Sequence, residues 1–347
     1  MRRFARTLAA AVLAVAAVTG TAGWASAGSQ VEVTGPPPGT AEWRSDQGPG
    51  RPLPDPATAS PYEVARFFAG LGSAERERLA RRHPLVVGNL DGAPVRLRYE
   101  ANRLAVRATG DPRFAALAAP GRQVLAFDPR GRGQVAEVFG DLERSAHVAV
   151  VVPGSDNDAA GYDAPHAPYS GPGGMARSLR AATGGRAAVV AWTGYTTPVG
   201  VGLDAATGRL AEAGAARLTR FTQGLDAVGV ADPALFCHSY GSVVCGLAAA
   251  GLDARDLVVL GSPGMRAASV SALRTGARVW AAKGPSDWID DVPNVEVAGL
   301  GHGPDPAGRA FGARRVPASD VRGHTGYFAP GTTSLAAFAA IATGEIR

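Results

Sequence analysis

Lysine is nearly absent from this chain: Lys283 is the only one among 347 residues, and the other basic side chains are arginines. These arginines form no basic run, so the sequence lacks the electrostatic footprint of a nucleic-acid-binding protein. Charged residues make up only 19% of the chain and hydrophobic residues 46%, a balance that excludes bulk disorder. The length allows one large globular domain or two small ones, with an ample core.

Cysteine is scarce as well, with Cys237 and Cys245 as the two thiols. Neither has a partner ligand at a zinc-site spacing. The acidic cluster of Asp156, Asp158 and Asp163 lacks the glycine and terminal glutamate of a calcium loop, which favours a solvated surface loop. The sequence therefore predicts no metal and no cofactor. The two cysteines form either a disulfide or a pair of small buried thiols, and their spacing leaves both open.

The apolar run at the N-terminus, Leu8–Val18, is too short to span a bilayer comfortably. Three arginines precede it, and the small residues Ala25-Ser26-Ala27 follow it as a cleavage site. Residues 1–27 are thus predicted to be a signal peptide, and the mature protein to be secreted or associated with the cell envelope, without a stable membrane span. Arg2-Arg3 alone does not separate twin-arginine from general export. Without residues 1–27 the chain has 32 basic and 30 acidic residues.

The remaining chain falls into three parts. Residues 28–60 are rich in proline and glycine and predict an extended linker. Residues 61–115 predict short helices, the first capped by Ser60, which pack on the next domain because they are too few to fold alone. Residues 116–347 alternate strand and helix patterns, as in a mostly parallel sheet covered by helices on both faces. An α/β catalytic domain is therefore expected there.

Ser239 occupies the most informative turn of that domain. It stands between a strand pattern ending at Cys237 and a helix pattern beginning at Ser242, as a nucleophile elbow does in α/β-hydrolases. The usual motif is Gly-x-Ser-x-Gly. This chain keeps Gly241 and has Cys237 at the first glycine position, where a small residue is needed. The order of strand, serine turn and helix favours a nucleophile over an ordinary turn.

A serine nucleophile needs a base and an orienting acid, which in this fold follow the serine in the order acid, then histidine. Asp287 comes first after the strand pattern at 278–282 and is the preferred acid, with Asp290 and Asp291 as alternatives. His324, in a loop before the final helix pattern, is the preferred base over His302. His238, beside the nucleophile, is expected to be a hydrogen-bonded packing residue.

The oxyanion that forms during acyl transfer needs two backbone donors. The N–H of Tyr240, directly after the nucleophile, is one. The second is expected in the loop after the buried strand at 148–152, where Gly154 permits close approach and the N–H of Ser155 is the candidate.

Several blocks in this order resemble an actinobacterial α/β-hydrolase family that is catalogued as a domain of unknown function. The blocks are His83-Pro84, Gly88–Gly92, Ala126–Pro129, Val151–Gly154, His238–Ser242, Gly261–Gly264, His302–Pro306 and Gly323–Phe328. The resemblance covers about residues 60–330 and implies the α/β-hydrolase fold with Ser239, Asp287 and His324 as the triad. Because the family's substrates are undefined, it implies only fold and mechanism class.

The sequence thus predicts a secreted serine hydrolase that cleaves carboxylic esters through a Ser-His-Asp triad. The partner would be a small ester or acyl substrate, with no nucleic acid. The same triad could cleave amides or peptides. A non-catalytic module that binds the cell envelope is a third class, which the ordered Ser, Asp and His disfavour.

Overall fold

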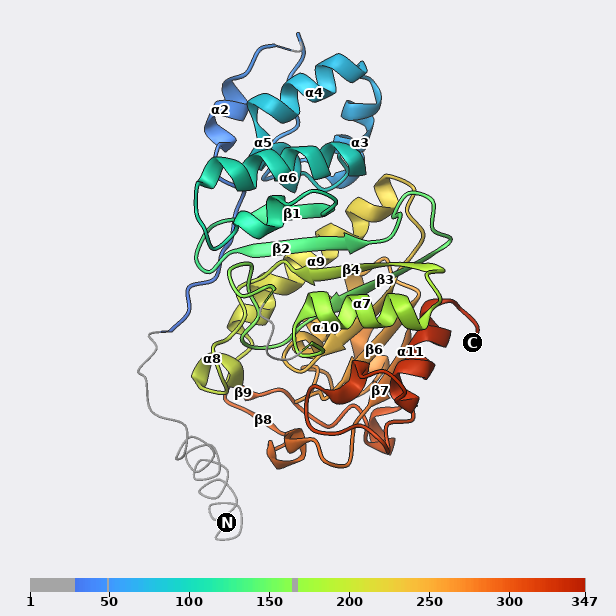
Figure 1. Cartoon of the computed structure of the whole chain (residues 1–347). Coiled ribbons are helices and arrows are strands. Elements are labelled where there is room, and N and C mark those ends of the chain that lie inside the picture. The colour runs from blue at the N-terminus through green and yellow to red at the C-terminus, as the bar shows by residue number, and fades with distance from the viewer. Residues whose placement is uncertain (1–28, 49, 164–167, 347) are drawn as a thin grey trace.

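The computed structural model describes residues 29–48, 50–163 and 168–346 (Figure 1). The predicted signal peptide, residues 1–27, lies outside this range. In the described residues, no helix is both long and apolar enough to cross a membrane, and no group of three or more His, Cys, Asp or Glu side chains could hold a metal ion.

An eight-stranded sheet forms the centre of the fold, in the order β1-β2-β4-β3-β5-β6-β7-β10. The strand β2 runs antiparallel to both of its neighbours, and the other pairs are parallel. The strands β1 and β2 form a hairpin. The strands are β1 (Val124–Asp128), β2 (Gln134–Phe139), β3 (His147–Val152), β4 (Ala187–Thr193), β5 (Ala234–His238), β6 (Asp256–Leu260), β7 (Arg278–Ala282) and β10 (Arg314–Arg315). A separate short hairpin pairs β8 (Glu296–Val297) with β9 (Leu300–Gly301).

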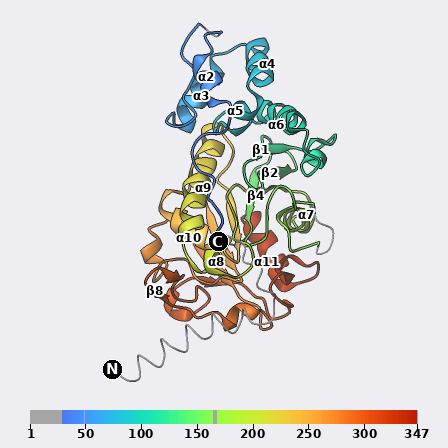
Figure 2. The same ribbon diagram turned by 90° about the vertical axis from the view of Figure 1, so that its left-hand side faces the viewer.

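Helices cover both faces of the sheet, as predicted, because alternate residues of the central strands are apolar on both sides. One core contains Val150, Leu235 and Val259 of the strands together with side chains of α9 (Arg209–Ala227) and α10 (Gly241–Ala248). The other contains Phe236 and Val258 with side chains of α7 (Pro172–Ala182) and α11 (Thr333–Ala342). Figure 2 shows the two pairs of helices on opposite sides of the sheet.

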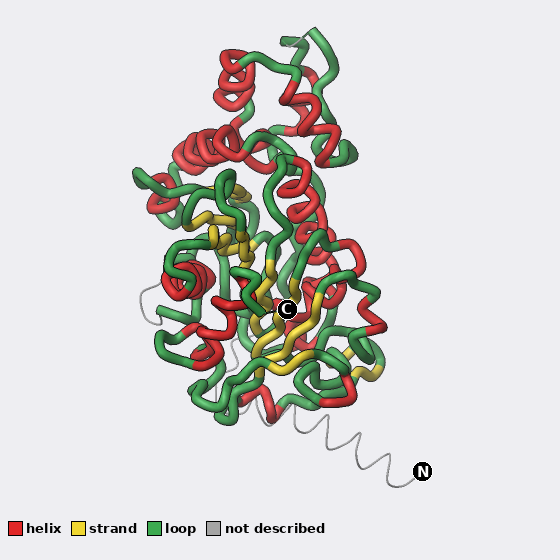
Figure 3. The backbone as a smooth tube through the Cα atoms, turned by 90° about the vertical axis from the view of Figure 1, so that its right-hand side faces the viewer, coloured by secondary structure: helices red, strands yellow, loops and turns green. Residues whose placement is uncertain are grey.

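A helical unit precedes the sheet and has a core of its own around Trp43, Val64 and Phe68. Ser60 caps its helix α3, as the sequence predicts, and the structure adds a reciprocal capping box with Glu63. Figure 3 shows this unit at the β1 end of the sheet. Its helices are α2 (Thr40–Ser45), α3 (Pro61–Ala69), α4 (Ser73–Arg82), α5 (Pro84–Asn89) and α6 (Val95–Thr109).

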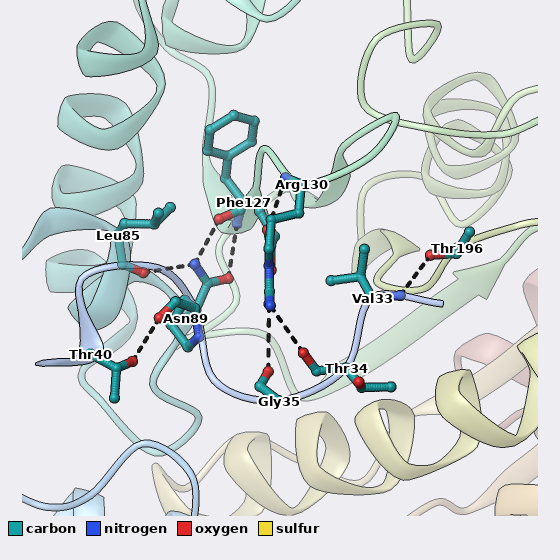
Figure 4. A network of polar contacts seen from close by, with 11 residues as sticks. Val33, Thr34, Gly35, Thr40, Leu85, Asn89, Phe127, Arg130 and Thr196 are labelled. Carbon is teal, nitrogen blue, oxygen red and sulfur yellow. Dashed lines mark hydrogen bonds and ion pairs between the residues drawn. The ribbon is translucent and has the colours of Figure 1, made fainter. Parts of the chain in front are cut away.

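The stretch 29–60, for which the sequence predicts an extended linker, lies against the rest of the protein over its described residues. The Arg130 guanidinium donates to the carbonyls of Thr34 and Gly35, and the N–H of Val33 donates to Thr196 Oγ1 (Figure 4). Trp43, in the helix of this stretch, is fully buried. Proline and glycine prevent regular structure in most of the stretch, but they do not prevent it from binding a surface through its backbone.

Candidate active site

Ser239 lies on the turn between β5 and α10, with a backbone φ of 55°. This left-handed conformation is strained for a residue with a side chain and persists only where neighbours hold it. The Ser239 N–H donates to the carbonyl of Leu260 on β6, and its carbonyl accepts from the N–H and the hydroxyl of Ser242. The turn is thus fixed from both sides and presents the serine at the carboxyl end of β5.

Gly241 allows α10 to begin directly against the end of β3. A Cβ atom there would lie 2.4 Å from the carbonyl oxygen of Val152 and 2.7 Å from that of Pro153. No side chain fits in that space, which explains why the motif retains this glycine.

Cys237 and Cys245 are joined by a disulfide, with their Cα atoms 6.5 Å apart. This separation is within the normal range for such a bridge. Both residues are fully buried, and the bond connects the end of β5 to α10 across Ser239. The position that usually holds the first glycine of the motif therefore carries a covalent cross-link.

His324 and Asp287 come together beside this turn. Nδ1 of His324 is 2.8 Å from Oδ1 of Asp287, which follows β7 and is buried. An Nδ1–H that donates to the carboxylate leaves Nε2 as the proton acceptor. Nε2 is itself buried and has no hydrogen-bond partner among the described residues, Ser239 included. In free enzymes the bond between serine and histidine often forms only when substrate binds.

The Asp287 carboxylate is held by three donors. Besides His324, the Tyr327 hydroxyl donates to Oδ2 at 2.5 Å, and the N–H of Ile289 donates to Oδ1 at 2.9 Å. Burial raises the pKa of Asp287, but these hydrogen bonds and the charge of His324 more than offset it, so the pKa lies below its usual value. Asp287 is therefore an ionised acid that can orient an imidazole.

Two aromatic rings flank His324. The ring centroid of His238 is 4.6 Å away and that of Trp288 is 4.4 Å away. Nε2–H of His238 donates to the His324 carbonyl at 2.7 Å, which matches the packing role predicted for this residue. Burial and the nearby His324 lower the pKa of His238 to about 3, so its ring is neutral at physiological pH. Together these contacts restrict how far the His324 ring can turn.

The alternative acids and base have other partners. Asp290 forms an ion pair with Lys283. Asp291 is exposed and accepts no side-chain hydrogen bond from His324. His302 is buried, and its Nε2 donates to the carbonyl of Ala205 while its ring packs edge-on against Tyr240. The geometry thus brings His324, and not His302, to Asp287.

Gly154 follows β3 and lies against the elbow. A Cβ atom on it would lie 2.6 Å from Ser239 Cβ and 2.9 Å from the N of Tyr240. The N–H groups of Tyr240 and Ser155, the two expected oxyanion donors, donate to no acceptor among the described residues. Two free backbone donors beside a strained serine could bind a developing negative charge.

Two contributors to the site were not predicted from the sequence. Tyr327 lies in the short helical turn Gly326–Phe328, three residues after His324, a spacing that brings two side chains to one side of a turn. Trp288 directly follows Asp287 and is 41% exposed. Each adjoins a predicted triad residue in sequence, but only the packing shows that it contacts one.

A cavity of about 790 Å³ lies elsewhere, between the β1–β2 hairpin and α7, and is lined by residues of 120–123, 137–140 and 177–185. None of the residues of the Ser239 site lines it. The chemistry of the elbow, and not this cavity, therefore identifies the candidate active site.

The sequence matches one family model and two uncharacterized relatives. A family described as alpha/beta hydrolase matches residues 128–297, which include Ser239 and Asp287 but end before His324. Two uncharacterized proteins, one from each of two strains of Mycobacterium tuberculosis, are 30% identical over 374 residues. The alignment covers 84% of this chain and 57% of each relative, so the chain spans little more than half of their length.

Solved structures similar to this chain include three hydrolases. A dienelactone hydrolase from Anabaena variabilis is 17% identical, with a TM-score of 0.38 over 61% of this chain and 90% of its own. A serine hydrolase without a lid from Xanthomonas campestris is 16% identical, with a TM-score of 0.40 over 65% and 95%. A 2,6-dihydroxy-pseudo-oxynicotine hydrolase is 13% identical, with a TM-score of 0.41 over 82% and 90%.

The chain has the α/β-hydrolase fold. The strand order with β2 antiparallel, the elbow after β5 and the matching family agree on it.

Proposed function

We propose that this protein is an exported serine hydrolase that cleaves carboxylic esters through an acyl-enzyme. The observation that carries the proposal is the contact of 2.8 Å between His324 Nδ1 and Asp287, located beside a serine held at a positive φ. A strained serine, a base free at Nε2 and a buried ionised acid are the parts of an acyl-transfer site.

In the proposed reaction, Ser239 Oγ attacks the ester carbonyl carbon while His324 Nε2 takes the hydroxyl proton. The carbonyl oxygen becomes an oxyanion that accepts hydrogen bonds from the N–H groups of Tyr240 and Ser155. The C–O bond to the alcohol then breaks, and His324 returns the proton to that alcohol. Water attacks the acyl-enzyme by the same sequence and releases the acid. Asp287 remains ionised and holds the imidazole in one tautomer.

The export part of the proposal is supported by the disulfide as well as by the predicted signal peptide. Disulfides persist in oxidising compartments and are rare in the cytosol. We expect the mature protein to begin at Gly28 and to be recovered outside the cytoplasm. N-terminal sequencing by mass spectrometry tests this, and recovery of the uncleaved chain from the cytoplasm alone would contradict it.

Labelling with a fluorophosphonate probe, followed by hydrolysis of short p-nitrophenyl esters, tests the chemistry. Wild-type protein should react with the probe and release nitrophenol, and Ser239→Ala should do neither. Ser271→Ala removes an exposed hydroxyl away from the elbow and should behave as wild type. Equal labelling of wild type and Ser239→Ala would refute the nucleophile. If the wild type cleaves amides or peptides but not esters, the same triad belongs to an amidase or peptidase. If the probe does not label the wild type at all, a binding module is favoured.

A further inference from the structure

The exposed hydrophobic side chains of this protein are concentrated around the candidate active site. Eleven large hydrophobic side chains are exposed in the described residues, and seven of them lie in residues 199–203 and 288–300. We call these seven the apolar collar. Leu203, the most exposed of them, is 73% accessible, and Leu300 is 47% accessible. Exposed apolar patches of this kind mark binding surfaces.

The first part of the collar is attached to the proposed oxyanion loop. The N–H of Asp156, next to Ser155, donates to the carbonyl of Pro198, and the N–H of Gly200 donates to the Asp156 carboxylate. These bonds hold the backbone beside Val199 and Val201 against the loop that follows β3. The short helix α8 (Leu203–Ala206), which carries Leu203, follows these residues directly in the chain.

The second part of the collar contacts the triad histidine and the residues that follow α8. Trp288 packs on the ring of His324. Leu300, on β9, pairs with Thr207, whose carbonyl accepts a hydrogen bond from the Tyr240 hydroxyl. Figure 1 shows α8, β8 and β9 next to one another. The collar therefore borders both the base and the residue that follows the nucleophile.

These segments offer no free positive charge to an anionic ligand. Residues 194–206 and 284–301 contain five acidic residues and no lysine or arginine. The basic side chains nearest to them are already paired: Arg209 with Asp204, Arg266 with Glu296, and Lys283 with Asp290 and Asp305. A carboxylate, a phosphate or an anionic lipid surface would therefore find no unpaired basic side chain in these segments to bind.

We propose that the apolar collar binds the aliphatic chain of an uncharged ester, so that the natural substrates are neutral esters with a chain of six or more carbons. This inference rests on the proposed function and specifies its substrate class. Burial of a methylene group favours binding by about fourfold when it is complete. Because the collar stays half-exposed, each methylene group that contacts it should contribute only part of this fourfold gain in affinity.

Two substrate series test the proposal below their critical micelle concentrations: p-nitrophenyl esters with acyl chains of two to eight carbons, and alkyl acetates with alcohols of the same lengths. In at least one series we expect kcat/KM to rise about tenfold or more from the shortest to the longest chain. The series that rises shows whether the chain belongs to the acid or to the alcohol. A flat or falling profile in both would overturn the proposal while leaving the hydrolase itself established.

Collar variants give the matched comparison. In Leu203→Ser combined with Leu300→Ser, the ratio of kcat/KM for the octanoyl ester to that for the acetyl ester should fall about tenfold. The control is Ile346→Ser, an exposed apolar residue beside Glu345. Glu345 pairs with Arg186 just before β4, at the amino ends of the parallel strands and so opposite the elbow. This control should keep the wild-type ratio, and equal ratios in all three proteins would refute the collar.

Charge and competing occupants are tested separately. An ester whose eight-carbon acyl chain ends in a carboxylate should be cleaved at least tenfold more slowly than the octanoyl ester. Sedimentation with phosphatidylcholine vesicles and gel filtration of the wild type complete the test. Tight vesicle binding without chain-length preference would replace the proposal with a membrane surface, and concentration-dependent dimers that the Leu203→Ser, Leu300→Ser protein does not form would replace it with a second copy of the chain.

Discussion

The Tyr327 hydroxyl donates a hydrogen bond of 2.5 Å to Oδ2 of Asp287, the carboxylate whose other oxygen contacts His324. The same hydroxyl accepts a hydrogen bond from the N–H of Gly284. Tyr327 therefore links the loop that carries the acid to the turn that carries the base. Asp287 is held from two sides, so its position does not depend on the imidazole alone.

Replacement of Tyr327 by phenylalanine should weaken catalysis without abolishing it. The change removes one hydrogen-bond donor to Asp287, and this loss raises the pKa of the Asp287 carboxyl. The carboxylate then orients the His324 ring less firmly. We expect kcat/KM for a short p-nitrophenyl ester to fall about tenfold, a loss of about 1.4 kcal/mol of transition-state stabilisation. Tyr62→Phe, which removes an exposed hydroxyl bonded to Asp226, is the control and should leave kcat/KM unchanged. Equal activity of both variants would remove Tyr327 from the site.

Substitution of Gly154 tests the close approach of the proposed oxyanion loop. Alanine there would place Cβ 2.6 Å from Ser239 Cβ and 2.9 Å from its Oγ, so either the loop or the serine must move. Because removal of one oxyanion donor costs about a hundredfold or more, we expect kcat of Gly154→Ala to fall by at least that factor. Gly276→Ala, at a position with open space around it, should retain full activity. Wild-type kcat in Gly154→Ala would show that the loop does not take part.

Buried neutral His238 should make the protein less stable in mild acid. Its pKa is about 3 in the folded state and about 6.5 when unfolded, so between these values only the unfolded chain binds the proton. The stabilisation is complete above pH 6.5 and is lost as the pH falls toward 3. By pH 5 the loss should be about 2 kcal/mol.

Urea unfolding of wild type and His238→Gln at pH 7.5 and pH 5 measures this effect. Glutamine can donate to the His324 carbonyl but does not titrate, so its free energy of unfolding should change less between the two pH values. Parallel changes in the two proteins would show that His238 is not the responsible group.

The disulfide should stabilise the elbow. Closing the short loop between Cys237 and Cys245 restricts the unfolded chain by about 2 kcal/mol. The free energy of unfolding of the double variant Cys237→Ala, Cys245→Ala, measured by urea unfolding, should therefore be lower by this amount. Intact mass after alkylation without reductant checks the bond itself, since the oxidised protein takes up no alkylating group. Uptake of two groups by the unfolded, unreduced wild type would contradict the bridge.

The sequence by itself determined the parts whose signal is local. Ser239 and Gly241 stand between a strand pattern and a helix pattern, and the structure has the strand β5 and the helix α10 there. The alternation of apolar runs and helices likewise predicted a mostly parallel sheet, because strands buried on both faces must be apolar throughout. The N-cap at Ser60 was predictable for the same reason.

Tertiary structure decided which distant residues meet. The sequence preferred Asp287 only by its position, because Asp290 and Asp291 follow the same strand and remained alternatives. The structure directs Asp287 to His324 and pairs Asp290 with Lys283. The bond between Cys237 and Cys245, the contact of Tyr327 with Asp287 and the apolar collar also depend on packing between elements far apart in the chain. Local sequence sets which elements form, whereas contacts across the sheet set which side chains become neighbours.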